Sequence, residues 1–185
     1  MSDADRLRWD GRYATLGPVD VEAAALPAVF THCADEFPVA GKALDLACGQ
    51  GGTSVWLARR GLRVWGVDAS PVVIDQARDL ADRCQVLQRC RFSVADLDDG
   101  LPVGEPMEAI VCHRFRAQHL YPAIVERLAP GGLLAISVLS EVGADPDPYR
   151  APPGELSAAF AELELIAAGE GDGIAWVVAR RAADR

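Results

Sequence analysis

The sequence predicts an α/β protein whose mostly parallel sheet is covered by helices on both faces. Beyond position 40, apolar runs of strand length alternate with segments of helical periodicity, which is typical of strand–helix–strand units. The runs are almost continuously apolar, as expected for strands that are buried on both faces of a sheet. A glycine-rich stretch joins the first run to the first helical segment, where open α/β sheets bind ligands. We expect one domain over residues 1–185, with N-terminal helices in 1–40 and a core in 41–185.

The elements are expected in the following order. Two helices are expected before the core, at 3–13 and 21–33. Apolar runs predict parallel strands at 42–47, 62–67, 91–95, 107–112 and 133–139. Helical patterns lie after the glycine-rich stretch and at 70–84, 118–128 and 153–160. The last two runs, 162–168 and 173–181, are joined by the short turn GEGDG, which predicts an antiparallel pair.

The clearest helix signal lies at 70–84. Ser70 is a good N-cap residue and Pro71 suits the first helical position. One face of this segment carries the apolar residues Val73, Ala77, Leu80 and Cys84. The helix at 118–128 is expected to stop at Pro130-Gly131-Gly132, and 140–153 reads as a loop rich in proline and glycine.

Charge and composition exclude several classes of function. The formal net charge is −9 and the isoelectric point is near 4.8, which argues against nucleic acid and anionic membranes as partners. No apolar window reaches the length of a membrane helix and the N-terminus does not resemble a signal peptide, so we expect a cytoplasmic protein without a membrane partner. The odd count of five cysteines favours reduced thiols, and the cysteine and histidine spacing predicts no metal site.

The segment KALDLACGQGG raises the question of what its carboxylate does. Asp45 lies in the first apolar run, and a buried carboxylate is costly unless a cation or several donors accompany it. A dinucleotide fingerprint would need a third glycine where Ser54 stands, and an acid here would repel a pyrophosphate. A ligand that carries an ammonium group fits better than NAD or FAD.

Two further carboxylates follow later strands. Asp68 ends the second run, 19 residues after Gly49, close to the spacing of an acid that holds ribose hydroxyls. Asp96 follows the third run, where it can accept a hydrogen bond from an exocyclic amine such as that of adenine. An ammonium, a ribose and an adenine together describe S-adenosylmethionine.

These motifs resemble those of class I S-adenosylmethionine-dependent methyltransferases. DLACGQG is similar to the glycine loop of that family, with Ala47 where the family usually has its first glycine, and VWGVDAS, VADLDD and LAPGGLLAISV follow in the family's order. The resemblance implies a Rossmann-like sheet of seven strands in the order 3-2-1-4-5-7-6, with the last strand antiparallel. It also implies S-adenosylmethionine as cofactor, S-adenosylhomocysteine as product and a methyltransferase of the EC 2.1.1 type.

The resemblance assigns roles to individual residues. Asp45 and the loop backbone at Ala47 and from Gly49 to Gly51 would hold the methionyl part, Asp68 the ribose, and Asp96 with Leu97 the adenine. The predicted cofactor site also contains Ala69 and Cys112. WDGRY and RAPPGELSAAF are similar to segments of small bacterial tellurite-resistance and thiopurine methyltransferases. That likeness implies a cofactor lid formed by Trp9 and Tyr13, although such an aromatic pair also serves to anchor a helix to a core.

The substrate side is expected where the fourth strand ends in CHRFRAQH. His113 is the candidate general base, with a structural histidine as the alternative. Arg114 and Arg116 favour an acceptor that carries a carboxylate, phosphate or oxyanion, unless they form surface ion pairs. The loop 140–153, with Tyr149 and Arg150, is expected to border the substrate pocket.

We therefore expect a methyltransferase that acts on a small-molecule acceptor, as a monomer or homodimer. One alternative is a protein that binds S-adenosylmethionine or S-adenosylhomocysteine without turnover, as a sensor or assembly partner. A nicotinamide-dependent oxidoreductase is a second alternative, which the missing third glycine and Asp45 disfavour. The identity of the acceptor is left open at this stage.

Overall fold

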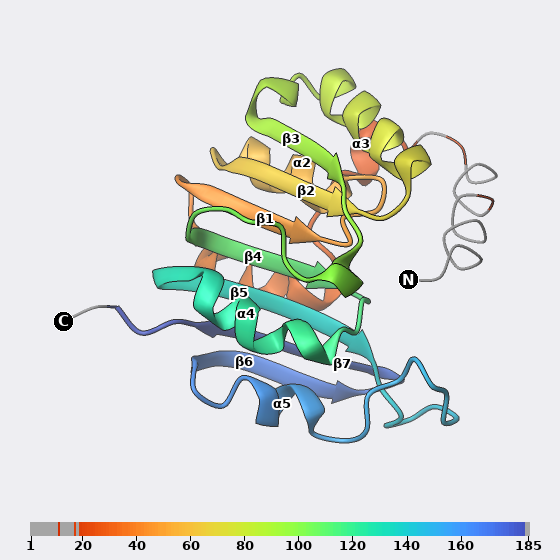
Figure 1. Ribbon diagram of the computed structural model, residues 1–185, viewed down its shortest axis with the longest axis vertical. Helices are drawn as coiled ribbons and strands as arrows, with labels where there is room; N and C mark the ends of the chain where they lie inside the picture. The colour runs from red at the N-terminus through yellow and green to blue at the C-terminus, as the bar shows by residue number, and fades with distance from the viewer. Residues whose placement is uncertain (1–10, 12–16, 18, 184–185) are drawn as a thin grey trace.

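A computed structural model describes Gly11, Gly17 and residues 19–183. The helix expected at 3–13, with Trp9 and Tyr13, lies outside the described residues. In the described part of the chain the strands form a seven-stranded sheet in the order β3-β2-β1-β4-β5-β7-β6 (Figure 1). The predicted fold class and strand order are confirmed.

The first five strands run parallel to one another. β7 runs antiparallel to both of its neighbours, β5 and β6. β1 pairs with β2 and β4, β2 with β3, and β4 with β5, all in parallel, whereas β7 lies antiparallel between β5 and β6. Asp45 of β1 lies opposite Gly66 of β2 in this register, and His113 of β4 lies opposite Ser137 of β5. The strands are β1 Lys42–Leu46, β2 Arg63–Asp68, β3 Cys90–Val94, β4 Met107–His113, β5 Leu128–Leu139, β6 Glu164–Gly171 and β7 Ile174–Arg180.

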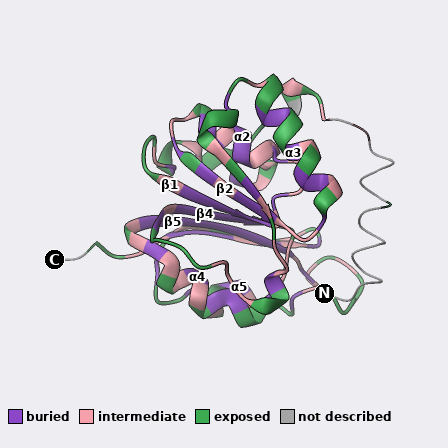
Figure 2. Ribbon diagram, turned by 45° about the horizontal axis from the view of Figure 1, so that its top comes forward, coloured by how far each residue is buried: buried purple, intermediate pink, exposed green. Residues whose placement is uncertain are grey.

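Helices cover both faces of the sheet, so that the protein has three layers (Figure 2). Helices α2 (Gly52–Arg59) and α3 (Pro71–Arg83) pack on one face, and α4 (Tyr121–Arg127) and α5 (Glu155–Ala159) pack on the other. An apolar core lies on each face because alternate strand residues point to opposite sides. No helix in the described ranges is both long enough and apolar enough to span a bilayer.

The N-terminal region differs from the expected single helix at 21–33. The structure has two short 3-10 helices instead, η1 (Val21–Ala23) and η2 (Ala28–Glu36). Pro27 stands immediately before η2 with an extended backbone. A proline removes a backbone donor and disfavours a helical conformation in the residue before it, which explains why the helix is interrupted here.

The turns show why the later elements begin and end where they do. β5 already starts at Leu128, and the register with β4 shifts between Met107 and Ala109, so the Pro-Gly-Gly segment forms an irregularity inside the strand. Between β6 and β7 the turn consists of Asp172 and Gly173, with φ of +50° and +77°. Positive φ at both turn residues is typical of a tight β-hairpin, so the predicted antiparallel pair is confirmed. The remaining 3-10 turns are η3 Leu87–Arg89, η4 Leu97–Asp99 and η5 Gln118–Leu120.

Candidate active site

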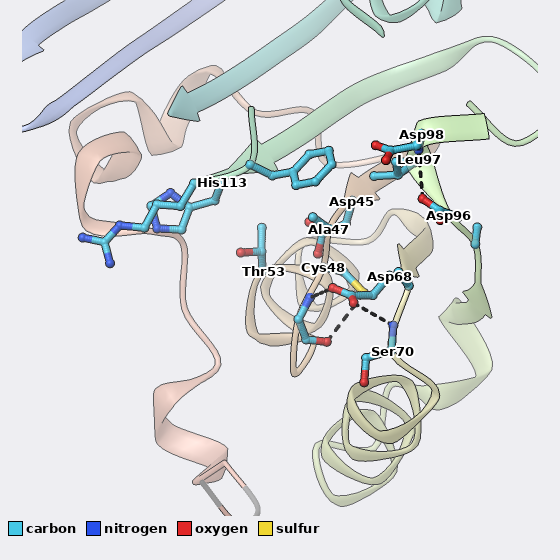
Figure 3. Close-up of a pocket in the computed structure, with 15 residues that line it drawn as sticks. Asp45, Ala47, Cys48, Thr53, Asp68, Ser70, Asp96, Leu97, Asp98 and His113 are labelled. Atoms are coloured by element: carbon cyan, nitrogen blue, oxygen red, sulfur yellow. Dashed lines mark hydrogen bonds between the residues drawn. The ribbon is translucent and has the colours of Figure 1, made fainter. Parts of the chain in front are cut away.

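A cavity of about 410 Å³ lies at the carboxyl ends of the parallel strands. Because these ends meet at one edge of the sheet, residues that are far apart in the sequence line the same space. Figure 3 shows Asp45 and Ala47 between His113 on one side and Asp68 and Asp96 on the other. The lining residues are Asp45, Ala47, Cys48, Gly49, Thr53, Asp68, Ala69, Ser70, Ala95, Asp96, Leu97, Asp98, His113, Arg114 and Phe115.

The glycine loop is tied to the end of β2 by its backbone. The N–H of Cys48 donates to the carbonyl of Val67 at 3.0 Å, and the N–H of Gly49 donates to Oδ2 of Asp68 at 3.0 Å. Ala47 and Gly49 both have positive φ, +51° and +53°. Alanine is strained in this left-handed region, whereas glycine is not, so Ala47 adopts this conformation at some cost in conformational energy.

Gly51 serves the packing of the loop against helix α3. It is the N-cap residue of α2 with φ of +82°, and a Cβ atom here would stand 2.8 Å from Cβ of Ala77. Gly51 does not line the cavity, unlike Ala47 and Gly49. Gly51 thus has a packing reason to be glycine, and its backbone contact with the cofactor stays a prediction.

Asp45 is buried and has a hydrogen-bond partner. Only 3 % of the residue is exposed, and Oγ of Ser54, in the first turn of α2, donates to its Oδ2 at 2.5 Å. Burial raises the pKa of Asp45 to about 7, the Ser54 hydroxyl lowers it and the nearby Asp68 raises it. The sequence predicts that a buried Asp45 needs a cation or several donors, and Ser54 supplies one of these donors.

Gly66 in the neighbouring strand leaves room for the side chain of Ser54. Gly66 lies opposite Asp45, and a Cβ atom on it would stand 3.0 Å from Oγ of Ser54. A larger residue at this position would press against the hydroxyl. Ser54 stands where a dinucleotide fingerprint would have its third glycine. Its hydroxyl instead donates to the buried carboxylate of Asp45.

Asp68 is oriented by two backbone donors. Its Oδ2 accepts from Gly49, and its Oδ1 accepts from the N–H of Ser70 at 3.1 Å. Ser70 in turn caps α3, because its Oγ accepts from the N–H of Val73 at 3.3 Å. The predicted N-cap is confirmed, and the same turn fixes the carboxylate at the cavity.

The segment after β3 forms the far wall of the cavity. Asp96 caps η4, and its Oδ1 accepts from the N–H of Asp98 at 3.0 Å. Leu97 is only 4 % exposed and belongs to the apolar core under this turn. Both residues line the cavity together, as the adenine assignment requires.

His113 lies on the opposite wall as a neutral imidazole. Its Nδ1 is 2.7 Å from Oγ of Ser137, and its ring meets the ring of Phe30 edge-on at 6.1 Å between centroids. Burial and the positive charge of Arg114 lower the pKa of His113 to about 4. A group with so low a pKa is a weak base, which favours the alternative of a structural histidine, and the general-base role stays a prediction.

The two arginines after His113 have separate roles. Arg114 lines the cavity, whereas Arg116 forms a two-pronged ion pair with Glu155 of α5, with Nη2 and Oε2 2.5 Å apart. Tyr121 and Gln118 donate to the same carboxylate at 2.9 and 2.6 Å. Arg116 thus holds the segment after β4 against α5, which agrees with the ion-pair alternative rather than with a substrate contact.

Other expected site residues lie outside the cavity wall. Cys112 is buried in the core, and its Sγ donates to the carbonyl of Phe115. In the loop 140–153, Arg150 donates to the carbonyls of Ser140 and Gly173, and Tyr149 is 62 % exposed. Within the described part of the chain, the loop contributes no residue to this cavity.

The structure brings nine of the predicted site residues into one cavity wall and adds others. Those predicted are Asp45, Ala47, Gly49, Asp68, Ala69, Asp96, Leu97, His113 and Arg114. The sequence reasoning did not assign Cys48, Thr53, Ser70, Ala95, Asp98 or Phe115 to the site. Most of these directly follow or precede a predicted residue, so adjacency to the strand-end motifs is the signal that would have found them.

The comparisons with known proteins agree with this geometry. The sequence model of a family described as "Methyltransferase domain" matches residues 43–132, which hold the glycine loop, all three strand-end aspartates and His113. The matched segment, 43–132, is a domain of the class I S-adenosylmethionine-dependent methyltransferases. The predicted family is thereby confirmed.

Two sequence relatives illustrate the range of this methyltransferase family. Trans-aconitate 2-methyltransferase of Streptomyces coelicolor is 36 % identical over 101 residues, 51 % of this chain and 33 % of that protein. Ribosomal protein L11 methyltransferase of Thermus thermophilus is 34 % identical over 135 residues, 70 % of this chain and 49 % of that protein. The chain thus spans between a third and a half of the length of these curated relatives.

Solved structures of methyltransferases share the fold at lower identity. Geranyl diphosphate C-methyltransferase from Streptomyces coelicolor, solved with S-adenosylhomocysteine, superposes with a TM-score of 0.68 at 18 % identity, over 90 % of this chain and 88 % of that chain. TehB from Haemophilus influenzae superposes with a TM-score of 0.68 at 20 % identity, over 76 % and 57 %.

Proposed function

We propose that this protein transfers a methyl group from S-adenosylmethionine to a small-molecule acceptor. The observation that carries the proposal is one cavity in which the glycine loop, the buried Asp45 and the backbone-held Asp68 meet. A carboxylate that is kept at a ligand cavity despite burial favours a ligand with a positive charge. The methionyl ammonium of the cofactor supplies such a charge.

The cavity residues fit the parts of this cofactor. Asp45 faces the ammonium group, with the backbone at Ala47 and Gly49 beside the methionyl carboxylate. Asp68 accepts hydrogen bonds from the ribose hydroxyls next to Ala69, and the turn of Asp96 and Leu97 holds the adenine. When bound, the cofactor supplies an activated methyl group on a sulfonium. Trp9 and Tyr13 remain a predicted lid.

Methyl transfer from a sulfonium is an in-line displacement, so the protein contributes mainly alignment and exclusion of water. The glycine loop and the strand-end carboxylates fix the cofactor at one end of the cavity. The wall of His113, Arg114 and Phe115 is then left for the acceptor. Methyl transfer in a cavity divided in this way needs no strongly basic side chain.

A small acceptor is favoured by the size of the cavity, about 410 Å³, and by the names of some relatives. Trans-aconitate and 2-heptyl-1-hydroxyquinolin-4(1H)-one methyltransferases are named for small molecules, whereas the L11 methyltransferase is named for a protein. The net charge of −9 disfavours nucleic acid as the acceptor. We further propose that the protein acts in the cytoplasm, as a monomer or homodimer.

Isothermal titration of the protein with S-adenosylhomocysteine tests the proposal. Asp68→Ala should weaken binding by about 1.5–3 kcal/mol, since hydrogen bonds to a charged group are lost. Asp82→Ala, an exposed aspartate on the outer face of α3, is the matched control and should bind as the parent does. No binding by the parent protein, or equal binding by Asp68→Ala, would contradict the assignment.

A second candidate function is a cofactor-binding protein without turnover, as a sensor or assembly partner. The neutral His113 favours it, as does Cys48, because burial and the carboxylates of Asp45 and Asp68 raise the pKa of this thiol well above its usual value. Neither group readily takes a proton from an acceptor at neutral pH. Conversion of S-adenosylmethionine with any acceptor in a panel of acids, phenols, thiols and amines decides between the two functions.

A further inference from the structure

The tautomer of His113 follows from the hydrogen bonds of Ser137. Ser137 is fully buried, and its Oγ lies 2.7 Å from Nδ1 of His113 and 3.2 Å from the backbone N of Arg114. The N–H of Arg114 is a donor, so Oγ accepts there and its own proton needs an acceptor. Among the described residues, Nδ1 of His113 is the acceptor within reach. A neutral ring whose Nδ1 accepts carries its proton on Nε2.

His113 therefore offers a hydrogen-bond donor to the cavity. Its Nδ1 is used by Ser137, and its position in the wall leaves the Nε2–H group for a ligand. The edge-on contact with the buried Phe30 limits rotation of the ring. A donor at this position recognises an oxygen atom and takes no proton from it.

Arg114 adds a positive charge on the same wall. Its backbone has φ of +57°, a conformation that non-glycine residues rarely adopt, and its N–H is held by both the carbonyl and the hydroxyl of Ser137. This turn places Arg114, an exposed residue, at the cavity wall, while Arg116 is paired with Glu155. No carboxylate within the described ranges pairs with the guanidinium of Arg114 at salt-bridge distance.

The charges in the cavity are separated between its two ends. Asp68, Asp96 and Asp98 lie on the side that we assign to the cofactor, and Figure 3 shows His113 across the cavity from them. An anionic acceptor is repelled from the carboxylate side and attracted to the wall of His113 and Arg114.

We propose that His113 and Arg114 bind a carboxylate of the acceptor and that this carboxylate is itself methylated, so that the product is a methyl ester. The inference rests on the proposed function and names its acceptor class. A carboxylic acid is already ionised at neutral pH, so its oxygen is nucleophilic without a general base. The wall of His113 and Arg114, which presents a hydrogen-bond donor and a positive charge, suits such an ionised acceptor.

The reaction balances without proton transfer. One carboxylate oxygen is held by Nε2–H of His113 and by Arg114, and the other forms the new bond to the methyl carbon. The carbon–sulfur bond breaks, and its electron pair stays on sulfur as the thioether of S-adenosylhomocysteine. The negative charge of the carboxylate and the positive charge of the sulfonium cancel.

The first experiment identifies the bond that is formed. The protein is incubated with S-adenosylmethionine labelled in its methyl group and with benzoate, octanoate, succinate and citrate, each beside its uncharged amide. Carboxylates should give label that alkali releases as volatile methanol, because esters hydrolyse and ethers or methylamines do not. Turnover of phenols, thiols or amines, with label that alkali does not release, would overturn the proposal.

A binding measurement covers the case in which none of these acids is turned over. The complex with S-adenosylhomocysteine is titrated with the same acids and amides by calorimetry. At least one carboxylate should bind at least tenfold more tightly than its amide. Equal or absent binding of every acid to a complex that does hold S-adenosylhomocysteine would overturn this inference and leave the cofactor assignment intact. A failure to bind S-adenosylhomocysteine would instead remove the proposed function.

Variants separate a donor from a base at position 113. His113→Gln retains a side-chain N–H and should keep the KM for the carboxylate within about threefold, whereas His113→Phe should raise the KM at least tenfold. Arg114→Gln should raise the KM at least tenfold with a smaller change in kcat and with unchanged S-adenosylhomocysteine affinity. Arg59→Gln, an exposed arginine on α2, is the control for charge. Equal loss of kcat in both His113 variants, at unchanged KM, would contradict a donor role.

Discussion

The two ends of the cavity are built in different ways. At the cofactor end, Asp45, Asp68 and Asp96 stand at or next to the ends of three neighbouring strands, and their supports include backbone donors of the adjoining turns. At the acceptor end, His113 depends on Ser137 of the next strand, and the segment that follows depends on Glu155 of α5. The first end is formed mainly by local motifs, whereas the second is formed by contacts between distant segments.

This difference suggests that the two ends respond differently to substitution. Damage to a tertiary contact at the acceptor end should loosen the wall and cost stability while the cofactor end keeps its shape. Damage at the cofactor end should change ligand binding first. Three substitutions test the contrast, beginning with the largest expected effect.

Glu155→Ala should destabilise the protein by about 3–5 kcal/mol, the cost of removing one partner of a buried ion pair. The Glu155 side chain is 8 % exposed and accepts from Arg116, Tyr121 and Gln118, which would all lose their acceptor. Urea unfolding gives the free energy, and titration with S-adenosylhomocysteine gives the cofactor affinity. Affinity should stay within about threefold at temperatures where the variant is folded.

The matched control is Glu162→Ala, an exposed glutamate after α5, which should change the unfolding free energy by less than about 0.5 kcal/mol. A Glu155→Ala variant with the stability of the parent would show that the network is dispensable. A loss of cofactor affinity of tenfold or more would show that the two ends are coupled, and the contrast between them would fail.

Asp45→Asn should remove the contribution of Asp45 to the pH dependence of stability. The pKa of Asp45 is raised to about 7 in the fold from a reference of 3.8, so its favourable contribution is complete below pH 4 and is lost as the pH rises through 7. An asparagine does not ionise and still accepts from Ser54. Relative to that of the parent without cofactor, the free energy of unfolding of the variant should therefore rise by on the order of 2–4 kcal/mol between pH 4 and pH 8.

Urea unfolding of both proteins at pH 5 and pH 8 measures this gain, with the exposed Asp82→Asn as the control. The same Asp45→Asn protein should bind S-adenosylhomocysteine at least tenfold more weakly, because the ammonium loses its charged partner. Identical pH slopes in variant and parent would mean that Asp45 stays ionised in the fold. Its burial would then be offset by donors other than Ser54.

The contrast between the two ends also explains which features the sequence revealed. The strand order and the aspartate positions follow from motifs whose residues are close in sequence, and the family resemblance completes the order. Ser54 was read only as a missing glycine, because its contact with Asp45 requires the first turn of α2 to pack over β1. Ser137 and Glu155 lie 24 and 39 residues from their partners, and no local pattern marks such pairs.

The N-terminal helix prediction failed for a related reason. The helix expected at 21–33 took no account of Pro27, which interrupts it between η1 and η2. For Arg116, the sequence left a substrate contact and an ion pair both open, because no pattern named the acidic partner. The surrounding fold instead supplies Glu155, which a sequence pattern does not place.

The smallest expected effect concerns the single departure of the cofactor end from its family pattern. Ala47 has φ of +51°, and Gln85, at the end of α3 and remote from the cavity, has φ of +57°. A glycine relieves the strain of the left-handed conformation but adds freedom to the unfolded chain, and the net gain should be about 0.5–1 kcal/mol. Ala47→Gly and Gln85→Gly should thus stabilise the protein similarly in urea unfolding.

Ala47→Gly should also keep S-adenosylhomocysteine affinity within about twofold, because the loop backbone already has the shape that the ligand needs. A tenfold loss of affinity in Ala47→Gly alone would show that the alanine restricts the loop for binding, and that the cofactor end depends on more than its backbone conformation.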